Sequence, residues 1–184
     1  MDTRKLITSA NIGGIECEFC TDFRDILDIM NILDDPDLLE SERVEIALDY
    51  FYKTDDYKTD ILTAIKTMFA FISQGEDDNK SNVSQKPLYD WDKDFNIIIA
   101  PINRIMGEDV RGKEYLHWWT FLSAFMEIGE CTFSTYVSIR DKMNKGKKLE
   151  KYEERIYREH KNEITLKRKV DSTTQSIIDE IMGV

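Results

Sequence analysis

Two cysteines, Cys17 and Cys20, stand three positions apart near the N-terminus, a spacing that is typical of zinc sites and redox-active dithiols. A structural zinc site needs four ligands, and a redox pair usually opens a helix that follows a strand. The other cysteine and the two histidines are scattered along the chain, at Cys131, His117 and His160. Because Cys17 and Cys20 lie in an alternating strand pattern, we expect them to face opposite sides of that strand. We predict no metal ligand and no cofactor.

The acidic run DWDKD over residues 90–94 has the composition of the start of a calcium-binding EF-hand loop. Counted from Asp90, the sixth position is Phe95 where the loop needs glycine, and the twelfth is Pro101 where it needs glutamate. These two departures exclude a calcium site. Carboxylates are favoured at helix N-termini, so we expect Asp90 or Asp92 to cap a helix.

His117 precedes two tryptophans, Trp118 and Trp119. A histidine can act as a general base, but no nucleophile accompanies this one in a recognisable motif. We therefore expect a hydrogen-bonded histidine at the edge of the core, no catalytic residue and no enzymatic activity. Core packing is the expected role of the two tryptophans, and a partner surface is the alternative, since tryptophan is enriched at binding hot spots. Neighbours on a helix point about 100° apart, so one tryptophan can pack in the core and the other can face a partner.

The chain of 184 residues carries 25 basic and 36 acidic side chains, a net charge of −11. This balance disfavours a general nucleic-acid binder, which needs a field of Lys and Arg. The longest apolar runs fall far short of the roughly 20 residues that cross a bilayer, and the N-terminus lacks the apolar stretch of a signal peptide. We therefore predict a cytoplasmic protein that binds neither nucleic acid nor a membrane.

The charge is polarised along the chain. Residues 1–110 carry 11 basic and 24 acidic side chains, a net charge of −13, whereas residues 140–169 carry 12 basic and 6 acidic ones, a net charge of +6. Acids interleave with the bases of the second segment, which suits a solvated helix better than a nucleic-acid site. An acidic protein surface, including the N-terminal half of another copy, is an alternative partner.

Hydrophobic periodicity predicts a mainly α fold, a helical bundle with a short N-terminal β-hairpin and a charged C-terminal helical tail. Residues 1–143 form the predicted helical domain, with an exposed linker loop at 75–87, and residues 144–184 form the tail. Pro101 predicts a kink or a split in the helix that spans it. The hairpin is expected within residues 5–21, and the predicted helices cover residues 23–33, 41–51, 61–72, 91–105, 114–128 and 132–143, with Thr21-Asp22 and Ser41 as caps.

Four segments, in this order, resemble the gene-product-fifteen family of siphophages and of prophages of Gram-positive bacteria. They are the strand that runs into TDFR at 21–24, PLYDWDKD at 87–94, LHWWTF at 116–121, and the helix at 133–140 with its charged tail. The order and spacing of these segments carry the resemblance, which covers nearly the whole chain.

The resemblance implies a non-enzymatic tail assembly chaperone encoded beside the tape measure protein. Such a protein would coat the tape measure protein in the host cytoplasm until tail tube subunits replace it. From the polarised charge along the chain we also expect it to assemble with copies of itself. A structural tail component or connector retained in the virion is one alternative, and a small host-directed regulatory or nucleic-acid-binding protein is another. We predict partner contacts at Trp91, Trp118, Arg140, Tyr152 and Arg155.

Overall fold

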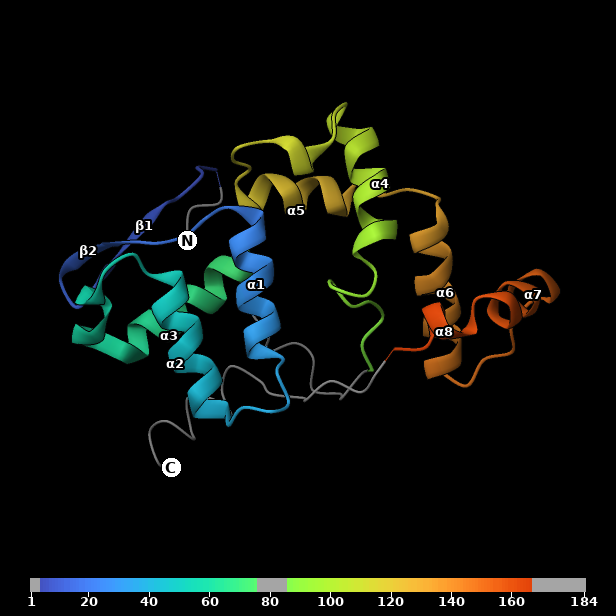
Figure 1. The fold of residues 1–184 in the computed structure, drawn as a ribbon, viewed down its shortest axis with the longest axis horizontal. Coiled ribbons are helices and arrows are strands. Elements are labelled where there is room, and N and C mark those ends of the chain that lie inside the picture. Colours follow the sequence, from blue (N-terminus) through green and yellow to red (C-terminus); the bar gives the residue numbers. More distant parts are fainter. Residues whose placement is uncertain (1–3, 76–85, 167–184) are drawn as a thin grey trace. The chain divides into compact units, whose positions relative to one another are not determined.

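The computed structural model describes residues 4–75 and 86–166, and this part of the chain is mainly helical, as predicted (Figure 1). It divides into two compact units. Unit 1 comprises the described residues 4–75 and 115–120, and unit 2 comprises residues 86–114 and 121–166. The boundary expected at residue 143 is therefore not where the compact units divide.

Unit 1 contains a β-hairpin followed by helices. Its elements are β1 (Ser9–Ile12), β2 (Ile15–Glu18), α1 (Phe23–Leu33), α2 (Glu40–Phe51), the 3-10 helix η1 (Asp55–Asp60) and α3 (Ile61–Ile72). Unit 2 contains α4 (Phe95–Met106), the 3-10 helix η3 (Val110–Gly112), α6 (Thr132–Asn144), α7 (Lys151–Glu159) and α8 (Lys161–Ile164). The first residues of α5 (Trp118–Met126) belong to unit 1 and the others to unit 2.

The predicted hairpin is confirmed. β1 pairs antiparallel with β2, and the register joins Ser9 to Glu18 and Ile12 to Ile15. The turn between the strands needs positive φ angles, which Gly13 and Gly14 supply at 58° and 93°. At Gly13 a Cβ atom would also lie only 2.8 Å from the Thr59 hydroxyl oxygen, so the hairpin end packs closely on η1.

The helix starts in unit 1 are set by carboxylates. Asp22 caps α1, as predicted, by accepting a hydrogen bond from the backbone N–H of Arg24 at 3.0 Å. The expected cap at Ser41 is wrong, because α2 already begins at Glu40. There the Glu42 carboxylate reaches back and accepts the backbone N–H of Leu39 at 2.9 Å.

Aromatic rings fill the core of unit 1. The ring of Phe19 stacks on Phe51 with centroids 4.7 Å apart, and it meets the edge of Phe71 at 5.0 Å. All three side chains are at most 1% exposed. Because these rings come from the hairpin, α2 and α3, they tie the three elements into one core.

The helix expected at 114–128 begins four residues later, at Trp118. The preceding residues are extended, and their backbone groups form hydrogen bonds with residues around the start of α1. The Leu116 carbonyl accepts the N–H of Phe23 at 2.9 Å, and the N–H of Trp118 donates to the Thr21 carbonyl at 2.7 Å. Because these backbone groups are already bonded to residues 21–23, they are not available for the hydrogen bonds of an earlier helical turn.

In unit 2, α4 runs as one helix across Pro101, so the predicted split does not occur. Proline has no N–H, and the Ile97 carbonyl therefore receives no helical hydrogen bond from position 101. The proline ring is buried, and the helix ends at Met106, just before Gly107, where φ is 73°. The helix thus loses a single internal bond at its middle rather than its continuity.

The charged segment after residue 144 packs on α6 instead of forming a separate tail. The cluster that joins them comprises Tyr136, Ile139 and Ile164, with Ile97, Leu149, Ile156 and Tyr157 packed around it. Most of the expected linker loop, the chain beyond residue 166 and the first three residues lie outside the described residues.

Candidate partner-binding surfaces

Arg140 lies inside unit 2, with only 4% of its side chain exposed. Its Nη1 and Nη2 donate to the two carboxylate oxygens of Asp94 at 2.6 and 2.9 Å, and the Asp94 side chain is 2% exposed. Further bonds from the guanidinium reach the carbonyls of Leu88, Glu163 and Ile164. The expected partner contact at Arg140 does not fit this burial, because every donor already serves the fold.

A second cation completes the attachment of α8. The Lys93 ammonium donates to the carbonyls of Asn162 and Thr165 at 2.7 and 2.6 Å. Lys93 and Arg140 together donate hydrogen bonds to four successive carbonyls at the end of a short helix, where carbonyls have no helical partner. This arrangement, which we call the carbonyl clasp, anchors residues 162–165 to the start of α4 and to α6.

Trp91 also lies inside unit 2, at 7% exposure. Its ring centroid is 4.6 Å from that of Phe125 and 5.2 Å from that of Tyr89. Phe133 joins the same cluster at 5.6 Å from Phe125. Trp91 therefore packs in an aromatic cluster at the start of unit 2 rather than presenting its ring to a partner.

Trp118 and Trp119 are both buried, at 1% and 3% exposure, so both pack in the core and the expected partner contact at Trp118 does not fit its burial. Their indole N–H groups donate to the carbonyls of Ile72 and Phe71 at 2.9 and 2.8 Å. These carbonyls lie in the last turn of α3, where helical donors run out. The two tryptophans therefore cap the C-terminus of α3.

His117 is buried and hydrogen-bonded, as expected, at 3% exposure. Its Nδ1 accepts the backbone N–H of Trp119 at 3.1 Å. Since Nδ1 is the acceptor, the proton of the neutral ring lies on Nε2, which faces the Ile7 carbonyl at 3.0 Å. The ring thus joins the N-terminal segment to the start of α5 within unit 1.

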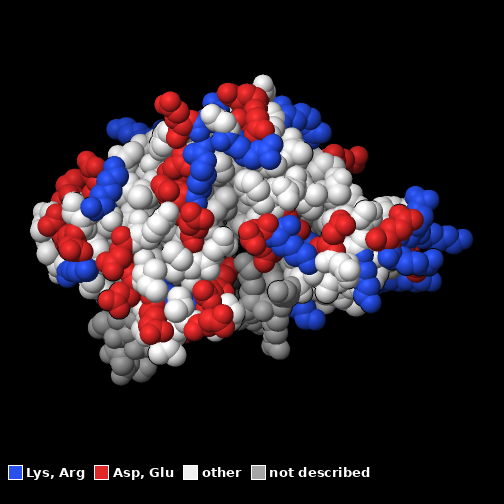
Figure 2. Space-filling model, viewed as in Figure 1, with Lys and Arg blue, Asp and Glu red and all other residues white. Residues whose placement is uncertain are grey.

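Tyr152 and Arg155 lie on the exposed side of α7, and Tyr152 is 56% exposed. The opposite side of α7 is held by Glu153, whose buried carboxylate accepts Lys142 of α6 at 2.7 Å and the N–H of Glu150 at 2.7 Å. Figure 2 shows blue side chains gathered over α7. The exposed bases on and before this helix are Lys147, Lys148, Lys151, Arg155 and Arg158. We call this surface the basic face.

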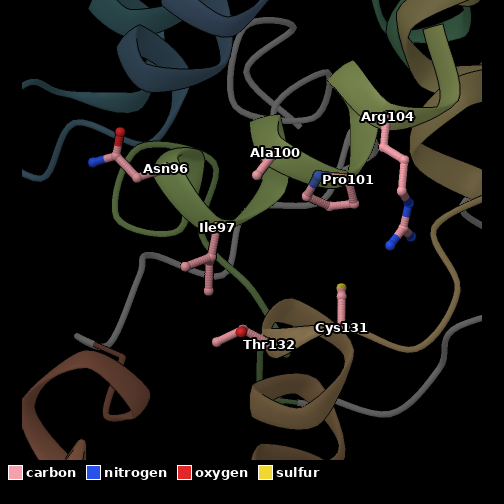
Figure 3. Close-up of a pocket in the computed structure, with 7 residues that line it drawn as sticks. All are labelled: Asn96, Ile97, Ala100, Pro101, Arg104, Cys131 and Thr132. Carbon is pink, nitrogen blue, oxygen red and sulfur yellow. The ribbon is translucent and has the colours of Figure 1, made fainter. Parts of the chain in front are cut away.

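A cavity of about 280 Å³ lies between α4 and the start of α6 (Figure 3). Ile97, Ala100 and Pro101 supply its apolar wall on α4, opposite Cys131 and Thr132. Figure 3 shows the side chains of Ile97 and Arg104 reaching from α4 toward the start of α6. We call this feature the α4/α6 groove. It combines an apolar floor with one cation at the rim.

A row of exposed apolar side chains lies along α2, beside its buried stripe. Leu39, Ile46 and Tyr50 are 67%, 41% and 43% exposed and recur at helical spacing along one line. Exposed acids border this line on α2, at Glu42, Glu45 and Asp49. Partial burial raises the pKa of Tyr50, and so do the nearby carboxylates of Asp25 and Asp28 on the α1 side. We call this surface the α2 face, and Figure 2 shows acidic side chains predominating over α1 and α2.

The cysteines and clusters of metal-ligating side chains are the remaining candidates for chemistry among the described residues. They contain no group of three or more His, Cys, Asp or Glu side chains that could hold a metal ion. Burial raises the pKa of the Cys17 and Cys20 thiols, so both favour the protonated and less reactive form. Within residues 4–75 and 86–166, no helix is both long enough and apolar enough to cross a membrane.

Comparison with known proteins decides the family. Residues 3–166 match the family described as Bacteriophage Gp15 protein. The chain belongs to the bacteriophage Gp15 family. No curated protein and no solved structure matches it. This Gp15 protein is therefore a phage protein.

Periodicity could have indicated the α2 face of the Gp15 protein, because Leu39, Ile46 and Tyr50 repeat at helical spacing beside the buried stripe. The α4/α6 groove has a weaker signal, since only Pro101 marks it in the sequence. The three predicted contacts at Trp91, Trp118 and Arg140 prove to be internal, and contact at Tyr152 and Arg155 stays a prediction.

Proposed function

We propose that this Gp15 protein is a non-enzymatic tail assembly chaperone that binds the tape measure protein. The α4/α6 groove is the observation that carries the proposal. Its volume of about 280 Å³ is slightly below that of a small-molecule pocket, and its floor is apolar. One or two apolar side chains of a docking helix match such a groove, in the way that amphipathic helices bind elsewhere.

This groove is consistent with what a chaperone of the tape measure protein has to do. A long chain with exposed apolar stripes aggregates at ordinary concentrations unless its stripes are covered. Many weak contacts can cover it through avidity and still be released when tail tube subunits arrive. The net charge of −11 would help to keep the coated chain in solution.

Co-expression with the tape measure protein tests the proposal. The wild-type chain should keep the tape measure protein in the soluble fraction and co-purify with it. Ala100 is an exposed residue of the groove, and Ala100→Arg would fill the groove and add a second cation beside Arg104. This variant should lose both effects because the docking side chains can no longer enter.

Ser138→Arg is the matched control. Ser138 is an exposed residue of α6 that does not line the groove, so the same new side chain there should leave binding unchanged. If tape measure solubility is indifferent to the wild-type protein, the proposed function is wrong. If the two variants behave alike, the groove is not the binding site.

A further inference from the structure

The α2 face lacks a covering element among the described residues, and it has an unusual layout. Its apolar line of Leu39, Ile46 and Tyr50 is bordered by acids on both sides. Single exposed apolar residues are normal on a protein surface, but three in a line on one helix are typical of a docking surface. Acids on both borders favour an occupant with basic flanks.

The basic face of α7 matches this layout. Lys151, Arg155 and Arg158 are exposed and recur at i, i+4 and i+7, so they form one row. Glu42, Glu45 and Asp49 form a row over the same number of residues on α2. Seven residues of helix advance about 10 Å, and the two rows are therefore equal in length as well as opposite in charge.

An apolar side chain accompanies each row. Tyr152 lies beside the basic row and is 56% exposed, and Tyr50 lies beside the acidic one at 43%. Glu154 and Glu159 interrupt the basic face, and Lys58 contacts Asp49 at 3.3 Å on the acidic side. These opposing charges weaken the electrostatic attraction between the two surfaces without reversing its sign, so the contact should be weak and sensitive to salt.

We propose that the basic face of one copy docks on the α2 face of another, so that copies of the chain join head to tail. Because the two surfaces differ, a joined pair still has one free basic face and one free α2 face, and the series can continue. This contact between copies does not depend on the proposed tape measure binding, and it uses neither wall of the α4/α6 groove.

Sedimentation velocity on the full chain tests the proposal over a range of concentrations. At an ionic strength of about 0.02 M the weight-average mass should rise with concentration, and at about 0.5 M the chain should sediment as a monomer. The double variant Asp28→Lys with Glu45→Lys, on the α2 face, should stay monomeric at both. Lys151→Glu with Arg155→Glu, on the basic face, should do the same.

Mixing the two double variants provides the decisive result. Each variant keeps one original surface, and their two altered surfaces are again opposite in charge, so the mixture should associate although neither variant does alone. Glu127→Lys with Glu130→Lys changes the net charge by as much as the α2 variant at exposed sites elsewhere and should associate like the wild type. A wild-type chain that stays monomeric at low salt, or a mixture that does not associate, would overturn the proposal.

Discussion

Arg140 donates five hydrogen bonds, and a guanidinium has five N–H groups. A buried ion pair contributes little by itself, because removing both charges from water offsets their attraction. Losing one partner is far worse, since the other charge stays buried and alone. Removal of the Arg140 side chain should therefore destabilise the whole of unit 2.

We expect Arg140→Ala to lower the free energy of unfolding by about 3–5 kcal/mol, because the Asp94 carboxylate would remain buried without its cation. Urea unfolding followed by circular dichroism measures this loss. Lys145→Ala is the control, since Lys145 pairs with Asp141 at the surface, where side chains are 53% and 33% exposed. The control should cost less than about 1 kcal/mol, and equal losses in the two variants would contradict the assigned role.

Trp118 gives a second prediction at this scale. Trp118→Ala should cost about 3–5 kcal/mol, because a fully buried aromatic side chain is lost. Trp118→Phe keeps most of the ring but leaves the Ile72 carbonyl without its donor, at a cost of about 1–3 kcal/mol. Thermal unfolding ranks the three proteins. A Trp118→Phe variant as stable as the wild type would show that the cap on α3 is unimportant.

At the scale of elements, α7 depends on one buried carboxylate. The hydrogen bond from Lys142, aided by the N–H of Glu150, holds the pKa of Glu153 below its ordinary value. A carboxylate whose pKa is lower in the folded state stabilises the fold fully above the ordinary pKa. That contribution is lost as the pH falls through the folded pKa.

Glu153→Gln should therefore weaken the acid sensitivity of α7. Glutamine cannot ionise, so the difference in unfolding free energy between wild type and variant should be largest near pH 7 and shrink below about pH 4. Urea unfolding at a series of pH values measures the difference. Glu154→Gln, on the exposed side of the same helix, should leave the pH profile of the wild type nearly unchanged.

Local patterns predicted the elements well and their partners poorly. The hairpin, α1 and α3 follow from glycines, a capping aspartate and an apolar stripe, which all act within a few residues. The start of α5 depends on bonds between residues 116–118 and residues 21–23, about 95 positions earlier. Likewise, nothing near Arg140 in the sequence indicates that it pairs with Asp94, 46 positions earlier, so its basic segment predicts a surface residue.

At the scale of the whole molecule, the main alternative to a chaperone is a component of the finished tail. A protein that leaves when tube subunits arrive should be absent from purified virions or present only in trace amounts. Quantitative mass spectrometry of particles, with the tail tube protein as internal reference, measures this directly. A fixed stoichiometry of the Gp15 protein to the tube protein would favour a retained connector and count against the chaperone.

Two features of the described chain set the order in which it can fold during synthesis. Unit 1 needs residues 115–120, which follow the first 29 described residues of unit 2, residues 86–114. Unit 2 in turn needs the carbonyl clasp on residues 162–165, close to the end of the described chain. Domains usually fold one after another as they leave the ribosome. Here the first unit must wait for part of the second to emerge, so a nascent chain halted before residue 115 should carry an exposed core that needs protection.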